Sequence, residues 1–152
     1  MIKPLDQKQI DISENIYDIF QVSYAVEAAL LKCEDFPPLN RSVEAIQSSK
    51  STFYGYFTHH SIAAVMELEE NPDHIHVRSL TVDPKYFRLG IGFKMLQYVL
   101  DNFTAELISV ETGHDNHPAV QFYLNFGFKK NKVFMTKVGI EKISFVLQRL
   151  HR

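Results

Sequence analysis

The residues best suited to chemistry lie in one short turn, where Arg88, Gly90 and Gly92 stand between a strand-like run and a helical pattern. Glycine lets a backbone approach a ligand closely. A helix N-terminus offers unpaired N–H groups and a partial positive charge. Together these features predict a phosphate site, to which Arg88 adds a charged contact. Taken alone, the turn is equally compatible with a structural turn that binds nothing.

Three phosphate ligands compete for this turn. A nucleoside triphosphate loop needs a Gly-Lys pair, which the sequence lacks. A dinucleotide site needs a third glycine at the position that Met95 occupies. The strand before the turn also follows an antiparallel meander instead of opening a βαβ unit. The third candidate is the diphosphate of coenzyme A.

A second motif decides between these alternatives. Residues 82–92 read VDPKYFRLGIG, and residues 116–128 read NHPAVQFYLNFGF. In this order and at this spacing, the two segments resemble the GNAT superfamily of N-acetyltransferases. Its first pattern is V-x-P, an aromatic residue, then [QR]-x-x-G-x-[GA]; its second is N-x-x-A-x-x-F-Y-x-x-x-G-F. One position departs from the family pattern, because Phe87 stands where Gln or Arg is usual and Arg88 follows it.

The resemblance implies acetyl-CoA as cofactor, held between two parallel strands that splay apart. The backbone of residues 80–82 would pair with the pantetheine arm as an added strand does. The diphosphate would lie on N–H groups around residues 89–93. The cofactor-binding residues implied in this way are Leu80, Thr81, Val82, Phe87, Arg88, Leu89, Gly90, Ile91, Gly92, Phe93, Asn116 and Tyr123.

Three residues are catalytic candidates. The resemblance implies that Tyr123 is the acid, because a phenol stays protonated at neutral pH and can donate to the departing sulfur. An amine must lose a proton to attack, and His76 is the first candidate for the base, with an ordinary pKa near 6.5. Glu111 is the second candidate. The alternatives are a core tyrosine, a surface strand histidine and a solvated strand end.

The sequence therefore predicts an acetyl-CoA-dependent N-acetyltransferase that acts by direct attack of a primary amine of a small molecule or peptide. The alternative is a catalytically degenerate acyl-CoA-binding module that senses or scaffolds. In the family, the first two helices and their link roof the acceptor pocket. In the corresponding segment, residues 33–40, Glu34 and Asp35 are candidates to receive a cation.

The composition limits the possible domain number, partners and cellular location. The 152 residues predict a single domain over 1–152, and 45% hydrophobic residues suffice for a core. A net charge of −2 without a basic run gives no indication of a nucleic-acid surface. The lone Cys33, the polar N-terminal residues and the lack of a long apolar run predict a cytoplasmic protein without a membrane segment. No ligand spacing points to a metal.

The spacing of apolar residues along the chain predicts the order of helices and strands. A helix is expected from Asp11 to Cys33, with Asp11 and Glu14 as a capping box, and a short helix over 41–50. Strands are expected over 51–60, 61–70, 74–82, 105–112, 132–138 and 142–150, with helices after Gly92 and from Pro118 to Gly127. This order predicts a mixed α/β fold, with a mostly antiparallel sheet, one splayed parallel pair and flanking helices. An exposed strand over 142–150 suggests a homodimer.

Overall fold

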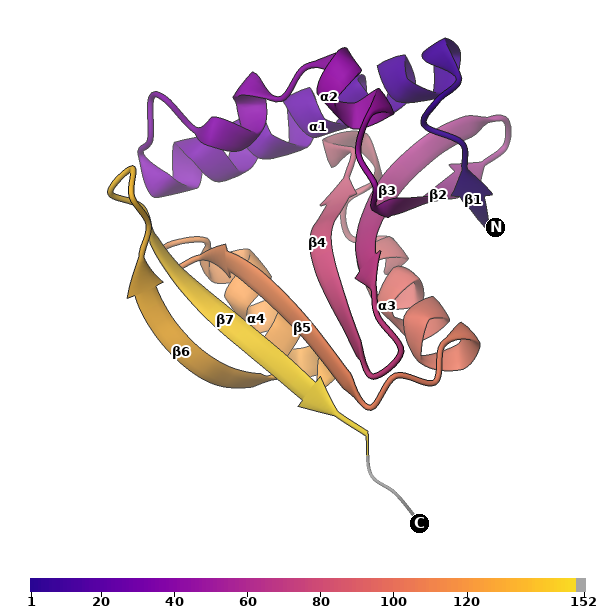
Figure 1. Cartoon of the computed structure of the whole chain (residues 1–152). Helices are drawn as coiled ribbons and strands as arrows, with labels where there is room; N and C mark the ends of the chain where they lie inside the picture. Colours follow the sequence, from indigo (N-terminus) through magenta and orange to yellow (C-terminus); the bar gives the residue numbers. More distant parts are fainter. Residues whose placement is uncertain (150–152) are drawn as a thin grey trace.

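One sheet organises the molecule. The computed structural model describes residues 1–149, and in that part seven strands form a single sheet in the order β1-β2-β3-β4-β5-β7-β6 (Figure 1). The strands are β1 (Ile2–Leu5), β2 (Thr52–Thr58), β3 (Ser61–Glu70), β4 (His74–Val82), β5 (Leu107–Gly113), β6 (Lys129–Met135) and β7 (Glu141–Gln148). β4 and β5 pair in parallel, and the other neighbours pair antiparallel. The predicted fold class is confirmed.

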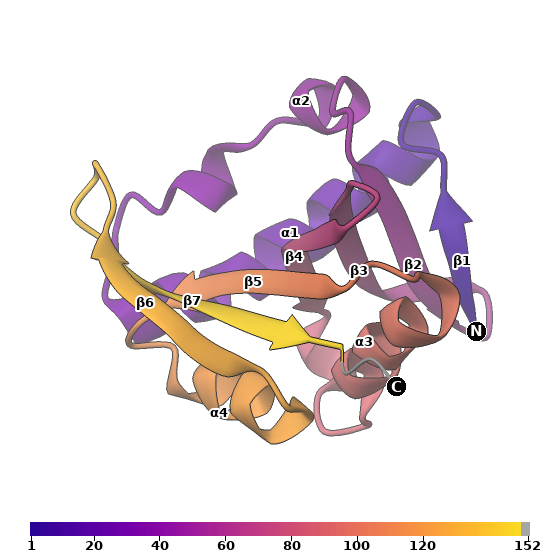
Figure 2. The same cartoon turned by 60° about the horizontal axis from the view of Figure 1, so that its bottom comes forward.

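Helices cover both faces of the sheet. They are α1 (Ile10–Leu31), α2 (Val43–Gln47), α3 (Ile91–Asn102) and α4 (His117–Phe126), with short 3-10 turns at Pro37–Asn40 and Pro84–Tyr86. Figure 2 shows α1 and α2 on one side of the sheet and α3 and α4 on the other. No helix in residues 1–149 is long and apolar enough to cross a membrane.

Two apolar cores follow from these layers. On one side, α3 buries Met95, Leu96 and Val99 against strand residues such as Val77 and Val110. Each fully buried side chain of this size contributes about 1.5–3 kcal/mol to folding. The smaller core joins α1 and α2 to the opposite face through Ile16, Ile19, Phe20, Ile46, Phe53 and Val65. The sheet is therefore held from both sides, and the site described below lies where its middle opens.

At the N-terminal end, one local expectation is wrong and one strand was not predicted. The Asp11–Glu14 capping box is absent, because α1 begins at Ile10 with Gln9 as its N-cap and Asp11 lies inside the first turn. The strand β1 was not predicted, since its sequence is short and mixed. It forms by antiparallel pairing with β2, in which Ile2 lies opposite Tyr56. Its Pro4 is tolerated because β1 is an edge strand.

The strand expected to be exposed is an inner strand. β7 lies between β5 and β6 and pairs with both, so its backbone groups have no free side for a second copy. Residue 150 of the expected segment lies outside the described residues. The free edges of the sheet are β1 and β6.

Candidate functional site

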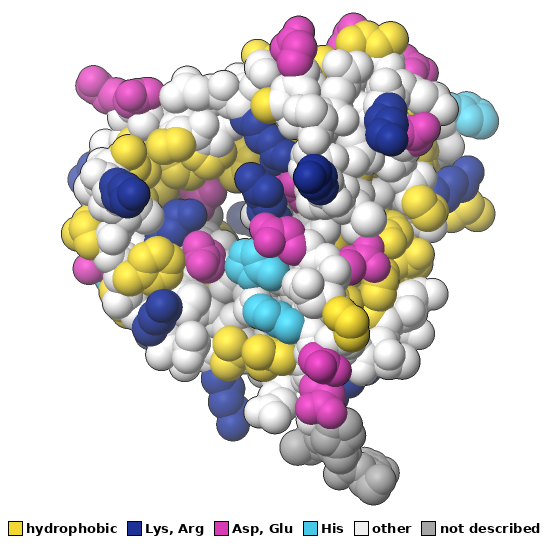
Figure 3. Space-filling view, in the orientation of Figure 1, with side chains coloured by type: hydrophobic (Ala, Val, Ile, Leu, Met, Phe, Trp, Pro, Cys, Tyr) yellow, Lys and Arg dark blue, Asp and Glu magenta, His cyan; other side chains and the backbone are white. Residues whose placement is uncertain are grey.

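The parallel strands β4 and β5 separate halfway along. Their pairing begins at His74 with Leu107 and ends at Val77 with Val110, although β4 runs on to Val82 and β5 to Gly113. Figure 1 shows the two strands diverging toward α1. A cavity of about 810 Å³ lies along the opening and is lined by both strands and by α1, α3 and α4. Figure 3 shows a hollow here, bordered by basic, acidic and histidine side chains.

One end of the cavity is the glycine turn. α3 begins directly after Gly90, which has a φ of +75°, in the left-handed region that glycine tolerates. Arg88 has a φ of +66°, which costs a residue with a side chain about 1–2 kcal/mol. No side chain in residues 1–149 caps this helix. The N–H groups of Ile91, Gly92 and Phe93 therefore remain available to an anion.

The second glycine of the turn has a packing role. A Cβ atom at Gly92 would lie 3.0 Å from the Cζ atom of Phe122 on α4. A side chain at this position would require the Phe122 ring to move by a few tenths of an ångström. The absence of a side chain at Gly92 therefore leaves room for the Phe122 ring of α4, and both helices line the cavity.

The other residues of the turn divide into two groups. Phe87, Arg88 and Phe93 line the cavity, whereas Leu89 is 59% exposed and is not part of the lining within residues 1–149. Phe87 and Phe93 are themselves 46% and 51% exposed, which is unusual for phenylalanine. The edge residues Leu80, Thr81 and Val82 also line the cavity. All predicted cofactor-binding residues except Leu89 thus converge on one cavity.

Tyr123 projects from α4 into the same cavity. The residue is 6% exposed, and its ring packs against Phe122, Phe128 and Phe145. Its hydroxyl has no hydrogen-bonding partner within residues 1–149. Burial, followed by the charge of Glu27, raises the pKa of Tyr123 above its ordinary value of 10. The phenol therefore remains a proton donor at neutral pH.

A carboxylate on α1 joins three elements around the cavity. Oε2 of Glu27 accepts hydrogen bonds from Thr112 Oγ1 at 3.1 Å, Gly113 N at 3.3 Å and Asn116 Nδ2 at 3.1 Å. Asn116 also caps α4, because its Oδ1 accepts a hydrogen bond from Ala119 N. Glu27 therefore fixes α1 to β5 and to the start of α4.

Sequence reasoning missed Glu27, although a signal was present. Phe20, Tyr24 and Glu27 follow the spacing i, i+4, i+7, which puts them on one stripe of α1. Phe20 is buried, and Tyr24 and Glu27 line the cavity. A charged residue on an otherwise inward-facing stripe indicates a partner that the sequence alone does not identify.

A bulge corrects the expected strand faces. Regular strand alternation would place His76, Arg78, Leu80 and Val82 on one face, and this expectation for the strand over 74–82 is wrong. Leu68 of β3 pairs with Val77 of β4, and the neighbouring Glu67 pairs with Ser79. Arg78 therefore has no partner on β3. Because of this extra residue, the side chains of β4 after Arg78 point to the opposite faces from those that regular alternation would give. Leu80 and Val82 consequently pack with the core on the α3 side.

His76 lies on the opposite side from Leu80 and outside the cavity lining found in residues 1–149. Its Nδ1 is 2.7 Å from Ser109 Oγ, and Nε2 of His74 is 2.6 Å from the same oxygen. Burial lowers the pKa of His76 below 6.5, and the charges of Glu111 and Glu69 partly oppose this effect. The imidazole is therefore neutral at pH 7, but the structure does not bring it together with Tyr123.

Glu111 does reach the cavity. It is the first residue of β5 beyond the last pair with β4, and it lines the opening. Its carboxylate is 37% exposed and lies 3.8 Å from Nζ of Lys142 on β7. Glu111 and Tyr123 therefore line the same cavity.

A buried ion pair supports β3 beneath α1. Glu67 is 0% exposed, and Arg41 donates to both its oxygens at 2.6 and 2.9 Å. Ser51 and Ser79 also donate to this carboxylate. Burial favours the neutral acid, but the hydrogen bonds from Arg41 and Ser51 outweigh it and lower the pKa of Glu67.

The helix link expected to roof the site contributes mainly packing. Phe36 is 4% exposed and packs edge-on against Tyr24, with ring centroids 6.0 Å apart. Glu34 and Asp35 are exposed and lie outside the cavity lining described for residues 1–149. Across the same part of the chain, no group of three His, Cys, Asp or Glu side chains is arranged to hold a metal ion.

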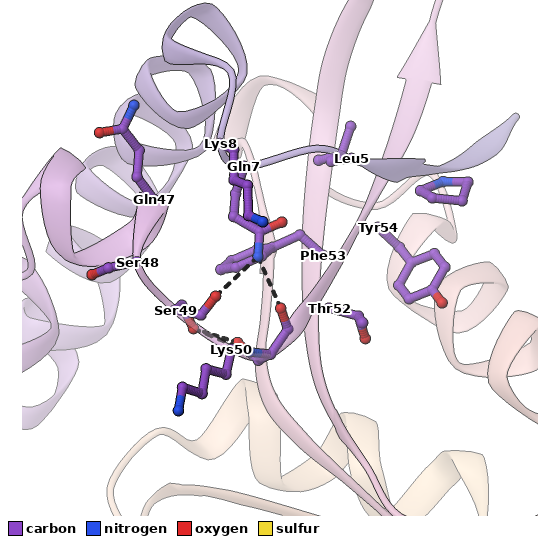
Figure 4. Close-up of a pocket in the computed structure, with 12 residues that line it drawn as sticks. Leu5, Gln7, Lys8, Gln47, Ser48, Ser49, Lys50, Thr52, Phe53 and Tyr54 are labelled. Atoms are coloured by element: carbon purple, nitrogen blue, oxygen red, sulfur yellow. Dashed lines mark hydrogen bonds between the residues drawn. The ribbon is translucent and has the colours of Figure 1, made fainter.

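A second cavity of about 530 Å³ lies away from the splayed strands, between β1, β2 and the link after α2 (Figure 4). Its central contacts are internal, since Gln7 Nε2 donates to the carbonyl oxygens of Ser49 and Ser51 at 3.1 and 3.0 Å. These bonds fix the N-terminal segment to the link, and none of the lining residues described for this groove is acidic.

Comparison with known proteins agrees with this geometry. The GNAT acetyltransferase family matches residues 14–128. The chain is 33% identical over 141 residues to the UPF0157 protein YqkA of Bacillus subtilis strain 168, covering 92% of this chain and 41% of that protein. The chain thus spans less than half the length of the curated relatives it matches.

Solved structures of other proteins share the fold. The ribosomal-protein-S18-alanine N-acetyltransferase of Escherichia coli matches with a TM-score of 0.75 and 19% identity, over 97% of this chain and 92% of that one. The PaiA N-acetyltransferase of Thermoplasma acidophilum, in complex with coenzyme A, matches with a TM-score of 0.67 and 18% identity, over 95% and 98%. Together with the family match over residues 14–128, the splayed strands and the glycine turn show that this chain belongs to the GNAT acetyltransferase family.

Proposed function

We propose that this chain binds acetyl-CoA between β4 and β5 and transfers its acetyl group to a primary amine of a small molecule or peptide. The observation that carries the proposal is the continuity of one cavity. Its lining runs from the uncapped N-terminus of α3, along the splayed edges of β4 and β5, to Tyr123 and Glu111. A diphosphate, an extended arm and a reacting carbonyl each meet a suitable group in that order.

The residues fit the cofactor chemically. Bound acetyl-CoA supplies an activated thioester. The N–H groups of the first turn of α3 suit the diphosphate, with Arg88 beside them. Arg88 has no ion pair or hydrogen bond within residues 1–149, so its guanidinium is available. Residues 80–82 pair with β3 on one side, and on the other side they lie beyond the last pair with β5 and have no strand partner in the described residues. An extended arm can hydrogen-bond to that side as an added strand does.

The roles of acid and base follow from position. Tyr123 holds its proton at neutral pH and has no competing partner in the described residues, so it donates to the departing sulfur. Glu111 accepts the proton from the amine and attracts its cationic form. We favour Glu111 over His76 because Glu111 lines the cavity, whereas the imidazole of His76 is engaged with Ser109.

A screen of amine acceptors tests this function. Polyamines, aminoglycosides, amino acids and peptides are incubated with acetyl-CoA, and thiol release is followed. Glu111→Gln is expected to lower kcat/KM at least about 10²-fold, as loss of a general base does. His76→Gln is expected to leave it nearly unchanged. The reverse pattern would assign the base to His76, and tight acetyl-CoA binding without turnover of any acceptor would point to a binding module.

A further inference from the structure

Two opposite charges occupy equivalent places where the strands part. The last parallel pair joins Val77 to Val110, so Arg78 and Glu111 are the next residue on each strand. Both line the cavity. No ion pair joins them in residues 1–149. Arg78 instead lies 3.9 Å from Glu67 and from Glu69, and Glu111 lies 3.8 Å from Lys142.

The guanidinium of Arg78 has spare hydrogen-bonding capacity. Its side chain is 52% exposed, and both of its ion pairs are at the outer limit of contact. Pairs of this kind contribute little. Glu67 is already satisfied by Arg41, which binds it through two nitrogens. Arg78 therefore remains able to bind a carboxylate through two parallel N–H groups.

The bulge in β4 explains why Arg78 reaches the opening. Its neighbours Val77 and Ser79 pair with β3, but Arg78 itself pairs with no residue of β3. Pairing with β5 has also ended one residue earlier. Bulges beside functional sites commonly re-aim a side chain in this way. Without the bulge, Arg78 would pair with a residue of β3.

The other charges in the cavity lining have different positions or partners. Arg88 stands in the glycine turn at the opposite end from Arg78, and Glu27 accepts three hydrogen bonds from β5 and α4. Among the described lining residues, an acceptor near the ends of the paired strands therefore meets one cation, Arg78, and one anion, Glu111. Figure 3 shows basic and acidic side chains on both sides of the hollow.

We propose that the acceptor is an amino-acid-like amine, which carries a carboxylate a few bonds from the reacting nitrogen. The amine is received by Glu111 and the carboxylate by Arg78. The inference rests on the proposed function, because it assigns a substrate class to the same site. A polyamine would place its second positive charge near Arg78, and a simple alkylamine would leave Arg78 without a partner. Both are therefore poorer acceptors.

Matched acceptors test this assignment. Each amino acid is compared with the amine formed by its decarboxylation, and glycine, β-alanine and γ-aminobutyrate vary the distance between the two charges. Initial rates are followed by thiol release. Binding of the same compounds to the protein loaded with coenzyme A is followed by calorimetry. Wild type is expected to prefer the carboxylate-bearing member roughly 10- to 100-fold, as loss of a charged hydrogen bond predicts.

Three variants separate the role of Arg78 from general effects. Arg78→Gln is expected to abolish the preference while leaving carboxylate-free amines unaffected, and Arg78→Lys to retain part of it. Lys130→Gln, which removes a charge from an exposed position on β6, is expected to leave the preference intact. Acetyl-CoA affinity is measured for every variant and is expected to be the same.

Several outcomes would overturn the inference. For wild type, these are acetylation of carboxylate-free amines at an equal or higher rate, or neither binding nor acetylation of any amino acid. For Arg78→Gln, they are an equal loss of rate with every acceptor, or weaker binding of acetyl-CoA. If wild type gave either of its two results but still bound acetyl-CoA, the proposed function would not be contradicted. Failure of wild type to bind acetyl-CoA would instead refute the proposed function itself.

Discussion

At the scale of single residues, the site depends on groups whose surroundings fix their protonation. Tyr123 is buried near the charge of Glu27, and both effects keep its phenol neutral. Burial also keeps the imidazole of His76 neutral at pH 7, because it lowers the pKa of His76, and Nδ1 of this residue lies 2.7 Å from Ser109 Oγ. A proton donor and a neutral imidazole thus lie near the same strands, and their positions relative to the cavity distinguish their roles.

Replacement of Tyr123 by Phe should impair catalysis without harming the fold. The change removes a hydroxyl that has no partner in the described residues and retains the ring that packs against Phe145. We expect kcat to fall about 10²-fold, with an unchanged Kd for acetyl-CoA and an unchanged Tm. Steady-state thiol release and thermal unfolding provide the measurement. A rate equal to wild type would remove Tyr123 from the mechanism.

The pKa of His76 should make stability depend on pH. The pKa is lower in the folded state than the value near 6.5 expected in the unfolded chain. As the pH falls through about 6.5, the unfolded state therefore binds the proton first and the free energy of unfolding decreases. Nearby His74 and Arg78 act in the same direction as burial, and Glu69 and Glu111 act against it.

We expect His76→Gln to lose less stability than wild type between pH 7 and 5, as urea unfolding at each pH would show. His60→Gln, in the exposed turn between β2 and β3, is the control and should follow wild type. Parallel pH curves for wild type and His76→Gln would contradict the burial of this imidazole.

At the scale of elements, the site is assembled by three contacts between segments distant in sequence. Arg41 and Glu67 join the link before α2 to β3, Glu27 joins α1 to β5 and α4, and Gly92 on α3 leaves room for α4. These contacts position the elements around the cavity, so we expect their loss to lower the stability of the protein or to weaken cofactor binding.

Removal of Arg41 should destabilise the protein strongly. Arg41→Ala leaves the carboxylate of Glu67 buried with its main counter-charge gone, and breaking such a pair costs about 3–5 kcal/mol. Arg41→Lys, which retains the charge, should lose less. Denaturant unfolding at pH 7 measures both. A loss below about 1 kcal/mol for Arg41→Ala, the size typical of a surface pair, would show that the pair is not buried in solution.

Two glycines in open, left-handed conformations form a matched pair. A Cβ atom at Gly90 or Gly139 meets nothing within 4 Å, and their φ values are +75° and +84°. Alanine at either position should cost about 1–2 kcal/mol in stability. Only Gly90→Ala should also weaken acetyl-CoA binding, because only Gly90 precedes α3. Calorimetry on both variants checks this, and equal affinities would contradict a diphosphate site at the turn.

The sequence predicted these elements unevenly. The glycine turn and the motif from Asn116 to Phe128 are local patterns, and each folds as its own residues dictate. The bulge at Arg78 and the role of Glu27 depend on which residues of another element lie opposite, and no local pattern specifies that. β1 was missed for the same reason, since it forms only through its pairing with β2.

At the scale of the whole molecule, one interruption in an otherwise continuous sheet creates the site. α1 and α2 cover one face and α3 and α4 the other, so the diverging halves of β4 and β5 open a passage between two packed layers (Figure 2). An apolar core lies on each side of the sheet. The order of elements and the one parallel crossover followed from the sequence, whereas the inner position of β7 did not.

Isothermal titration of acetyl-CoA into this chain tests the central claim most directly, namely that the cavity between β4 and β5 holds the coenzyme. The account predicts saturable binding with one site per chain, and a rise in Tm with ligand concentration, because about 100 Kd of free ligand adds roughly 2.7 kcal/mol of stability. No detectable binding at millimolar acetyl-CoA would contradict it.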